Sequence, residues 1–229
     1  MVHGAWHGGW CWRRVAGLLA AKGHRVFCPT LTGLGERAHL LTPAVDVDTH
    51  IQDVLGLLEA EELEDVVLAG HSYAGMVITG VAARARARLR RLVYLDALLV
   101  QDGESWAEAF PPEIAEARRR SAVMTNGVKA IPPPDPAIYG FADAADAEWV
   151  RRRMTPHPFA AFEHRNRWGG PVGNGVPKVY VDCTRPALAA LAAMKRDRLA
   201  GWDVIALATG HDLMVSAPAE LTEILTGLV

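Results

Sequence analysis

The sequence predicts an α/β fold in which helices cover both faces of a mostly parallel central sheet and a helical lid is inserted. Short apolar runs alternate with segments of helical periodicity near both ends of the chain. This alternation breaks only in a long middle stretch that holds most of the prolines. Alternating strands and helices build a parallel sheet, and such sheets bind ligands beyond the carboxyl ends of their strands.

Length and composition fit one domain with an inserted lobe. The chain has 229 residues, half of them hydrophobic, and a net charge of −2. This balance gives no general attraction to nucleic acid or to anionic membranes. The three cysteines form no C-x-x-C pair, and no signal peptide or membrane-spanning run is recognisable, so we expect a reduced, cytoplasmic protein.

The elements follow from apolar spacing and from Gly or Pro at the boundaries. We expect a core of residues 1–99 and 178–229, with 100–177 as the lid. Helices are expected at 12–21, 48–60, 74–86, 144–154, 186–199 and 217–228. Strands are expected at 24–29, 66–69, 92–97, 178–183 and 202–207.

A sharp turn with a serine at its apex follows the strand at 66–69. Gly70, Ala74 and Gly75 supply the small residues that such a strained turn needs, and Ser72 then stands beyond the carboxyl end of the strand. The pattern departs from G-x-S-x-G because Ala74 holds the fifth position and the glycine comes one residue later. An ordinary strand-to-helix loop with a capping serine is the alternative interpretation.

A glycine-rich loop opens the chain with His3-Gly4 and continues to Trp10. A backbone N–H just after such a His-Gly pair commonly forms half of an oxyanion hole. Only Met1 and Val2 precede it, so the expected strand is either very short or begins upstream. We do not expect His3 and His7 to bind a metal, since the glycines of this loop and the lack of a helical pattern argue against a metal pair.

Polar residues end three of the predicted strands: Ser72, Asp96 and His211. Their order along the chain, Ser–acid–His, is that of the α/β-hydrolase triad. A serine hydroxyl becomes a good nucleophile only when a base takes its proton, and the histidine needs a carboxylate to fix its tautomer. We therefore predict Ser72 as nucleophile, His211 as base and Asp96 as the acid.

Four motifs resemble one subgroup of the α/β hydrolases, which includes plant methyl esterases, hydroxynitrile lyases and their bacterial relatives. The motifs are residues 2–10, 31–37, Gly70-His71-Ser72 and Gly210-His211-Asp212-Leu213-Met214. The resemblance covers the chain outside the lid and implies the α/β-hydrolase fold. It also implies an oxyanion hole made by the N–H groups of Ala5 and Tyr73.

Two positions depart from that subgroup. Its acid usually follows the strand that here ends at Cys183-Thr184, where this chain has no carboxylate. We favour Asp96, one strand earlier, with Asp182 as the second candidate. The lyases carry a lysine after the catalytic histidine that stabilises the departing cyanide; here Asp212 would repel it.

The predicted activity is therefore hydrolysis of a small-molecule carboxylic ester through an acyl-enzyme, without cofactor or metal. The resemblance further suggests a homodimer. Two alternatives stay open: a lyase or decarboxylase on the same scaffold, and a binder of small ligands whose chemistry has decayed. Aromatic residues of the lid are available to line the substrate pocket, although most are expected to form lid core: Trp106, Phe110, Tyr139, Phe141, Trp149, Phe159, Phe162 and Trp168.

Overall fold

A central sheet of parallel strands organises the molecule. The computed structural model describes residues 1–229. Four strands lie in the order β1-β2-β6-β7, and Val2 adds an isolated parallel bridge to Gly70 at the β1 edge. The predicted α/β fold is confirmed. The strands are β1 (Val66–His71), β2 (Leu89–Leu95), β6 (Lys178–Cys183) and β7 (Val204–Leu207).

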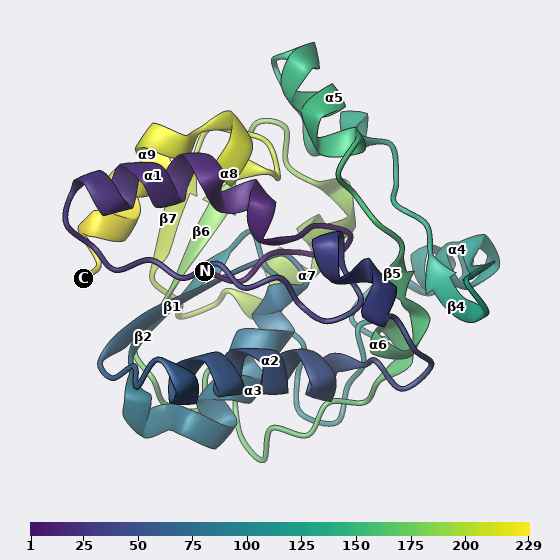
Figure 1. Cartoon of the computed structure of the whole chain (residues 1–229), viewed down its shortest axis with the longest axis horizontal. Coiled ribbons are helices and arrows are strands. Elements are labelled where there is room, and N and C mark those ends of the chain that lie inside the picture. The colour runs from purple at the N-terminus through teal and green to yellow at the C-terminus, as the bar shows by residue number, and fades with distance from the viewer.

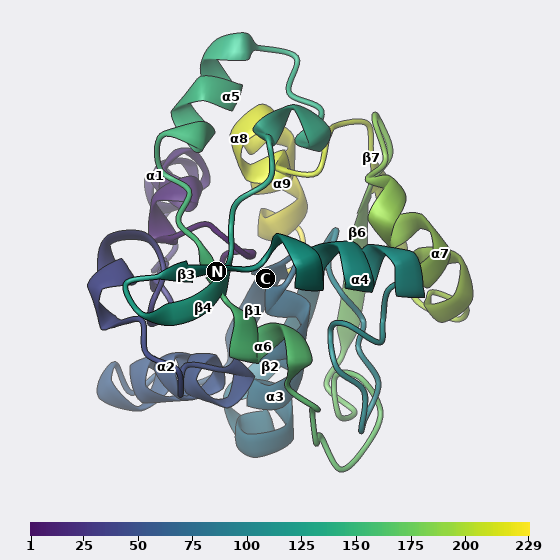
Figure 2. The same ribbon diagram turned by 90° about the vertical axis from the view of Figure 1, so that its right-hand side faces the viewer.

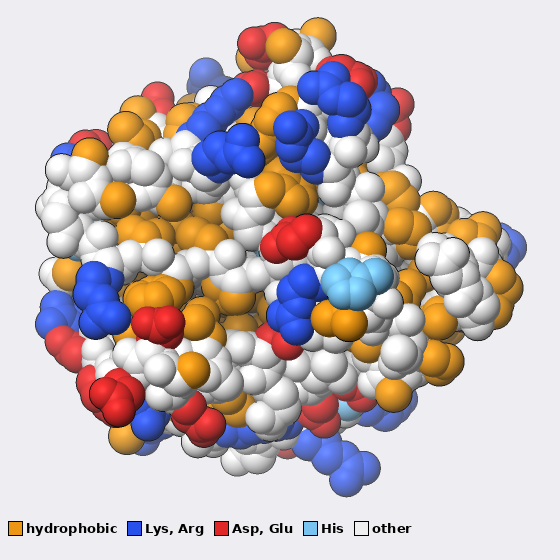
Figure 3. Space-filling model, viewed as in Figure 1, with side chains coloured by type: hydrophobic (Ala, Val, Ile, Leu, Met, Phe, Trp, Pro, Cys, Tyr) orange, Lys and Arg blue, Asp and Glu red, His pale blue; other side chains and the backbone are white.

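Helices cover both faces of this sheet (Figure 1). One layer consists of α1 (Arg13–Ala21), α8 (Leu213–Ser216) and α9 (Pro218–Thr226). The other contains α2 (Val47–Ala60) and α3 (Ala74–Ala85), and α7 (Ala189–Arg198) packs in the same hydrophobic cluster. No helix combines the length and the apolar character needed to cross a bilayer. Basic and acidic side chains share the face shown in Figure 3.

The boundaries of several elements differ from the expected ones. Residues 24–29, which were expected to form a strand, do not form one. The α2 helix is capped by Asp46, whose carboxylate accepts from the Thr49 N–H at 3.0 Å while the Thr49 hydroxyl accepts from the Asp46 N–H at 3.4 Å. This reciprocal capping box satisfies two free amides at the start of the helix, so α2 begins at Val47, one residue before the expected start at residue 48.

The segment between β2 and β6 forms a layer over the carboxyl ends of the strands and faces the viewer in Figure 2. It contains a three-stranded antiparallel sheet, β3-β4-β5, which hydrophobic periodicity did not reveal because its strands have four residues or fewer. The elements are α4 (Pro112–Ser121), β3 (Val123–Thr125), β4 (Val128–Ile131), α5 (Ala144–Arg151), β5 (His157–Pro158) and α6 (Phe159–Glu163). Short 3₁₀ turns lie at η1 (Gly9–Trp12), η2 (Gly35–Leu40), η3 (Arg86–Arg88) and η4 (Pro136–Tyr139).

Close packing explains the displaced glycine of the serine turn. A Cβ placed on Gly75 would lie 2.2 Å from the Leu98 carbonyl oxygen, a backbone atom that cannot move aside alone. Ala74, by contrast, is accommodated fully buried. The glycine requirement in this chain therefore falls on residue 75, where α3 meets the segment after β2.

We expect Gly75→Ala to destabilise the protein by about 1–3 kcal/mol or more, as overpacked sites do. Ala74→Gly should cost about 1 kcal/mol at most, the usual loss for glycine in a helix. Urea unfolding followed by circular dichroism measures both. A smaller loss for Gly75→Ala than for Ala74→Gly would contradict the packing argument.

Candidate active site

Ser72 occupies the turn between β1 and α3 in a left-handed conformation, with φ at +51°. Its N–H donates to the Leu95 carbonyl at 3.1 Å, and its own carbonyl accepts from the Leu98 N–H at 2.9 Å. These bonds tie the turn to the end of β2. Because the backbone is held on both sides, the half-buried side chain projects beyond the carboxyl end of the strand.

Two more non-glycine residues near this turn have a positive φ. Trp6 in the N-terminal loop has φ at +65°, and Asp96, directly after β2, has φ at +44°. Such conformations cost free energy in residues with a side chain and persist where the surrounding structure enforces them, often at functional sites. Three strained residues thus converge at the carboxyl edge of the sheet.

Asp96 is the carboxylate that contacts His211. Its Oδ2 lies 2.6 Å from His211 Nδ1, and both side chains are almost fully buried. Asp182, the second candidate, makes no contact with His211; its carboxylate lies 2.7 Å from the Lys195 ammonium. The adjacency of β1 and β2 brings Asp96 beside the serine turn, whereas Asp182 lies one strand further away.

Burial by itself would raise the pKa of Asp96. The hydrogen bond and charge interaction with His211, together with the neighbouring Lys195 ammonium, outweigh this effect and lower the pKa below its ordinary value. Asp96 is therefore an ionised carboxylate at neutral pH. The Asp96 carboxylate accepts a hydrogen bond from the Nδ1–H group of His211, which leaves the Nε2 atom of His211 free to accept a proton.

The loop after β7 brings His211 against the residue that precedes the serine. The ring centroids of His71 and His211 are 4.5 Å apart, and His71 Nε2 donates to the His211 carbonyl at 3.0 Å. No hydrogen bond joins the Ser72 hydroxyl to the His211 ring, whose recorded partner is Asp96. Serine–histidine bonds in free enzymes are commonly long and tighten when substrate binds.

Two backbone amides near Ser72 have no partner within the protein. Neither the Ala5 N–H nor the Tyr73 N–H donates to a carbonyl or side chain, although both residues are buried. Gly4 lies against the turn, since a Cβ there would be 3.0 Å from Ser72 Cβ and 2.8 Å from His71 Nδ1. Free amides beside a nucleophile are what an oxyanion hole requires.

A buried ion pair connects the N-terminal loop to the His211 loop, and sequence reasoning missed it. His7 Nε2 lies 2.9 Å from Asp212 Oδ2, and His7 Nδ1 lies 2.8 Å from the Ala5 carbonyl oxygen. Both partners are acceptors, so both ring nitrogens must donate and the ring carries a positive charge. Consistently, Asp212 outweighs the effect of burial and raises the pKa of His7.

His3 and His71 are buried beside the site and remain uncharged. Burial, which disfavours the imidazolium, and to a lesser extent the neighbouring histidines lower the pKa of each to about 3. Their ordinary value in the unfolded chain is near 6.5. Between these values the unfolded chain binds the extra protons, so stability falls as the pH decreases below about 6.5.

We therefore expect the free energy of unfolding to fall by about 2.7 kcal/mol per pH unit between pH 6 and 4 from these two histidines together. The raised pKa of His7 acts in the opposite sense, because its stabilisation is lost as pH rises through the folded value. Urea titrations at several pH values measure the slope. His71→Gln should reduce it by about 1.4 kcal/mol per unit; an unchanged slope would contradict the assignment.

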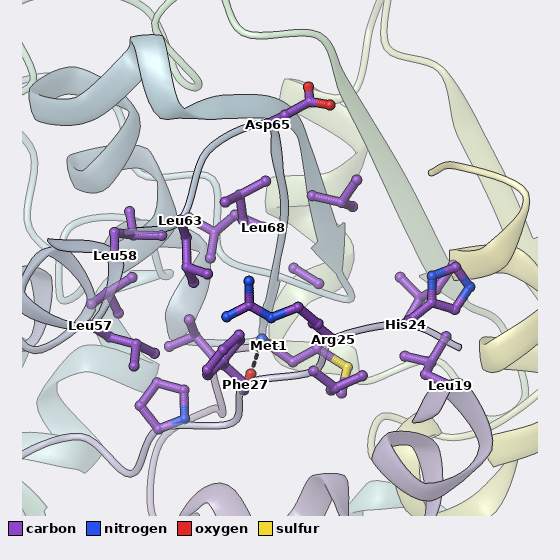
Figure 4. A pocket seen from close by; sticks show the side chains of 18 of the residues that line it. Met1, Leu19, His24, Arg25, Phe27, Leu57, Leu58, Leu63, Asp65 and Leu68 are labelled. Carbon is purple, nitrogen blue, oxygen red and sulfur yellow. Dashed lines mark hydrogen bonds between the residues drawn. The ribbon is translucent and has the colours of Figure 1, made fainter. Parts of the chain in front are cut away.

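One apolar cavity lies away from Ser72. It has a volume of about 280 Å³ and is lined mainly by apolar side chains around Met1, Phe27 and the amino-terminal half of β1. Figure 4 shows this lining, with the Met1 amino group hydrogen-bonded to the Phe27 carbonyl. Ser72 follows the opposite, carboxyl end of the same strand. We assign this cavity no part in the chemistry.

The segment 100–177 contacts the site directly. The His211 N–H donates to the Tyr139 carbonyl at 2.9 Å, and the Thr155 N–H donates to the Trp6 carbonyl at 2.9 Å. Trp6 Nε1 in turn donates to the Ile131 carbonyl at 3.0 Å. Five of the eight aromatic side chains named for the lid are buried: Trp106, Phe110, Tyr139, Phe162 and Trp168. The other three, Phe141, Trp149 and Phe159, are partly exposed.

One atom that could ligate a metal ion from each of His71, His211 and Asp212 lies within 4.8 Å of the others. His211 Nδ1 is already bonded to Asp96 and Asp212 Oδ2 to His7. The group therefore places an imidazole that is hydrogen-bonded to a carboxylate next to the strained Ser72.

The sheet, the serine turn and the His211 loop define an α/β hydrolase. The family model described as "Alpha/beta hydrolase family" matches residues 1–224, and the chain belongs to this family. The expected α/β-hydrolase fold is confirmed.

Individual relatives agree with the subgroup named from the motifs. The carbendazim hydrolyzing esterase of Nocardioides sp. (strain SG-4G) is 43% identical over 100% of this chain and 98% of its own length. The pFDCC methylesterase MES16 of Arabidopsis thaliana is 26% identical over 82% of this chain and 76% of its own. The solved structure of an extracellular α/β-hydrolase from a Paenibacillus species superposes with a TM-score of 0.82 at 21% identity, covering 99% of this chain and 96% of that chain. The resemblance to plant methyl esterases and bacterial esterases is confirmed.

Proposed function

We propose that this chain hydrolyses small-molecule carboxylic esters through an acyl-enzyme on Ser72. That it is an ester hydrolase follows from its family and from esterase relatives such as the Nocardioides enzyme. The observation that supports the mechanism best is the Asp96–His211 hydrogen bond of 2.6 Å beside the left-handed serine. This arrangement supplies a base oriented by a carboxylate, which ester hydrolysis by a nucleophilic serine needs.

In the proposed mechanism His211 Nε2 takes the Ser72 proton while Oγ attacks the ester carbonyl carbon. The oxyanion that forms receives hydrogen bonds from the free amides of Ala5 and Tyr73. The imidazolium then gives its proton to the departing alcohol, leaving an acyl-serine. Water attacks this acyl group with His211 again as base, which releases the carboxylic acid and restores the serine.

We further propose that the segment 100–177 acts as the lid that shapes the substrate pocket. Its Tyr139 ring lies 5.4 Å from the His211 ring, and Trp106 lies 5.5 Å from Tyr73, next to the serine. Both aromatic side chains are buried, and we propose that they form the apolar wall behind the site that the acyl or alcohol part of an uncharged ester would meet.

Asp212 argues against cleavage of cyanohydrins. The carboxylate is fully buried, and its interaction with His7 outweighs desolvation and lowers its pKa, so a negative charge stands beside the base loop. Because His7 balances this charge, the position offers a departing cyanide anion no free positive charge such as the lysine of the lyases supplies.

The mechanism is tested by incubating the protein with p-nitrophenyl acetate and identifying both products. We expect acetate and p-nitrophenol in equal amounts, and a fluorophosphonate should label Ser72 stoichiometrically with loss of turnover. Turnover without labelling of Ser72, or labelling at another residue, would refute the acyl-enzyme on this serine. Absence of any turnover would favour the small-ligand binder.

A further inference from the structure

A lysine lies directly behind the carboxylate of the proposed triad. Lys195, near the end of α7, forms an ion pair with Asp96 Oδ1, the oxygen that His211 does not use. The same ammonium lies 2.7 Å from Asp182 Oδ1 on β6. The Lys195 side chain is only 10% exposed, Asp96 is fully buried and Asp182 is 27% exposed.

We propose that Lys195 is a positioning residue that sets the charge of the Asp96–His211 pair, and with it the pH at which His211 becomes available as a base. The proposal rests on the function proposed above. One ammonium between two carboxylates makes a row in which His211, Asp96, Lys195 and Asp182 follow one another. The positive charge behind Asp96 weakens the attraction of that carboxylate for a proton on the imidazole.

The other groups around His211 leave this row as the main source of charge. His71 is buried and has a pKa lowered to about 3, so it stays neutral. Burial raises the pKa of Tyr139, which therefore stays protonated. Asp212 is paired with His7.

The surroundings of Lys195 point the same way. The Cys183 thiol packed against the row stays protonated because burial raises its pKa. Arg198, one turn further along α7, pairs with Glu104 at 2.6 Å instead. Despite the opposing effect of burial, the two carboxylates raise the pKa of Lys195, so the ammonium remains charged across the working range of an esterase.

A salt bridge that only held α7 in place would affect folding without moving the pH profile in a defined direction. Charge tuning makes two predictions of opposite sign. Removing the positive charge at Lys195 favours the imidazolium, which shifts the acidic limb of the kcat/KM profile to higher pH. Removing the negative charge at Asp182 leaves Lys195 to act on Asp96 alone and shifts the limb to lower pH.

The experiment compares pH profiles of kcat/KM for p-nitrophenyl acetate in Lys195→Gln, Asp182→Asn and the wild-type protein. For Lys195→Gln we expect a shift of roughly 0.5–1 pH unit upward, at the small end of what a neighbouring charge does. Asp182→Asn should shift the limb downward by less, because Asp182 is the more exposed partner. Lys195→Arg should restore the wild-type limb.

Arg196→Met is the matched control, since Arg196 is exposed on the same helix and forms no ion pair. It removes one positive charge and should leave the limb unmoved. The pH dependence of Ser72 labelling by a fluorophosphonate gives a second readout that needs no turnover. If Lys195→Gln does not fold, the downward shift in Asp182→Asn decides the question alone.

The inference would be overturned if the acidic limb of the kcat/KM profile stayed unshifted in both Lys195→Gln and Asp182→Asn, or moved in the same direction in both. Labelling of Ser72 in the same proteins would still support the proposed function. Failure of the function itself would appear differently, as wild-type protein whose Ser72 is not labelled.

Discussion

Ser72→Ala should lower kcat for ester hydrolysis by about 10⁴–10⁶-fold, the loss seen when a triad nucleophile is removed. The physical reason is that no other hydroxyl occupies the left-handed turn beside His211, so the acyl-enzyme cannot form. KM should change little, because the pocket and the free amides of Ala5 and Tyr73 remain. Steady-state kinetics with p-nitrophenyl acetate measure both constants.

The same variant should fold normally, since serine and alanine each place one Cβ at the strained φ of +51°. A thermal unfolding midpoint within a few degrees of wild type checks this. Ester hydrolysis above a tenth of the wild-type rate in pure, folded Ser72→Ala protein would remove the nucleophile from the mechanism.

Asp96→Asn should lower kcat by about 10³–10⁴-fold, as expected when an amide replaces the carboxylate that orients a catalytic histidine. An amide keeps the shape of the side chain but cannot stabilise the imidazolium, and its N–H₂ group favours the wrong histidine tautomer. The change also leaves Lys195 with Asp182 as its single carboxylate partner. Circular dichroism and a urea titration verify that the variant folds.

Asp182→Asn is the contrasting variant, because Asp182 contacts Lys195 but not His211. Its kcat at the plateau of the pH profile should stay within about tenfold of wild type, since the carboxylate is removed at a distance from the reacting atoms. The reverse ranking, with Asp182→Asn far more damaging than Asp96→Asn, would move the role of triad acid to Asp182.

Local features of the sequence determined the sheet and the residues at its edge. Apolar runs predicted β1, β2, β6 and β7, because parallel strands covered by helices are rich in apolar side chains, although β2 also carries Arg90 and Arg91 and β7 is only partly buried. Polar residues at the run ends then pointed to Ser72, Asp96 and His211. The short strands β3, β4 and β5 escaped detection, since runs of two to four residues have no measurable periodicity.

Only the tertiary structure decided which charges meet. Asp96 and Asp182 both lie at or near strand ends, and the sequence favoured Asp96 while leaving Asp182 as a second candidate. The choice depends on strand order, which places β2 next to β1 and turns Asp96 toward His211. The His7–Asp212 pair spans 205 residues and the Lys195–Asp96 pair brings α7 to β2. Such pairings arise from the path of the chain in space, because charge interactions act over a few ångströms regardless of sequence separation.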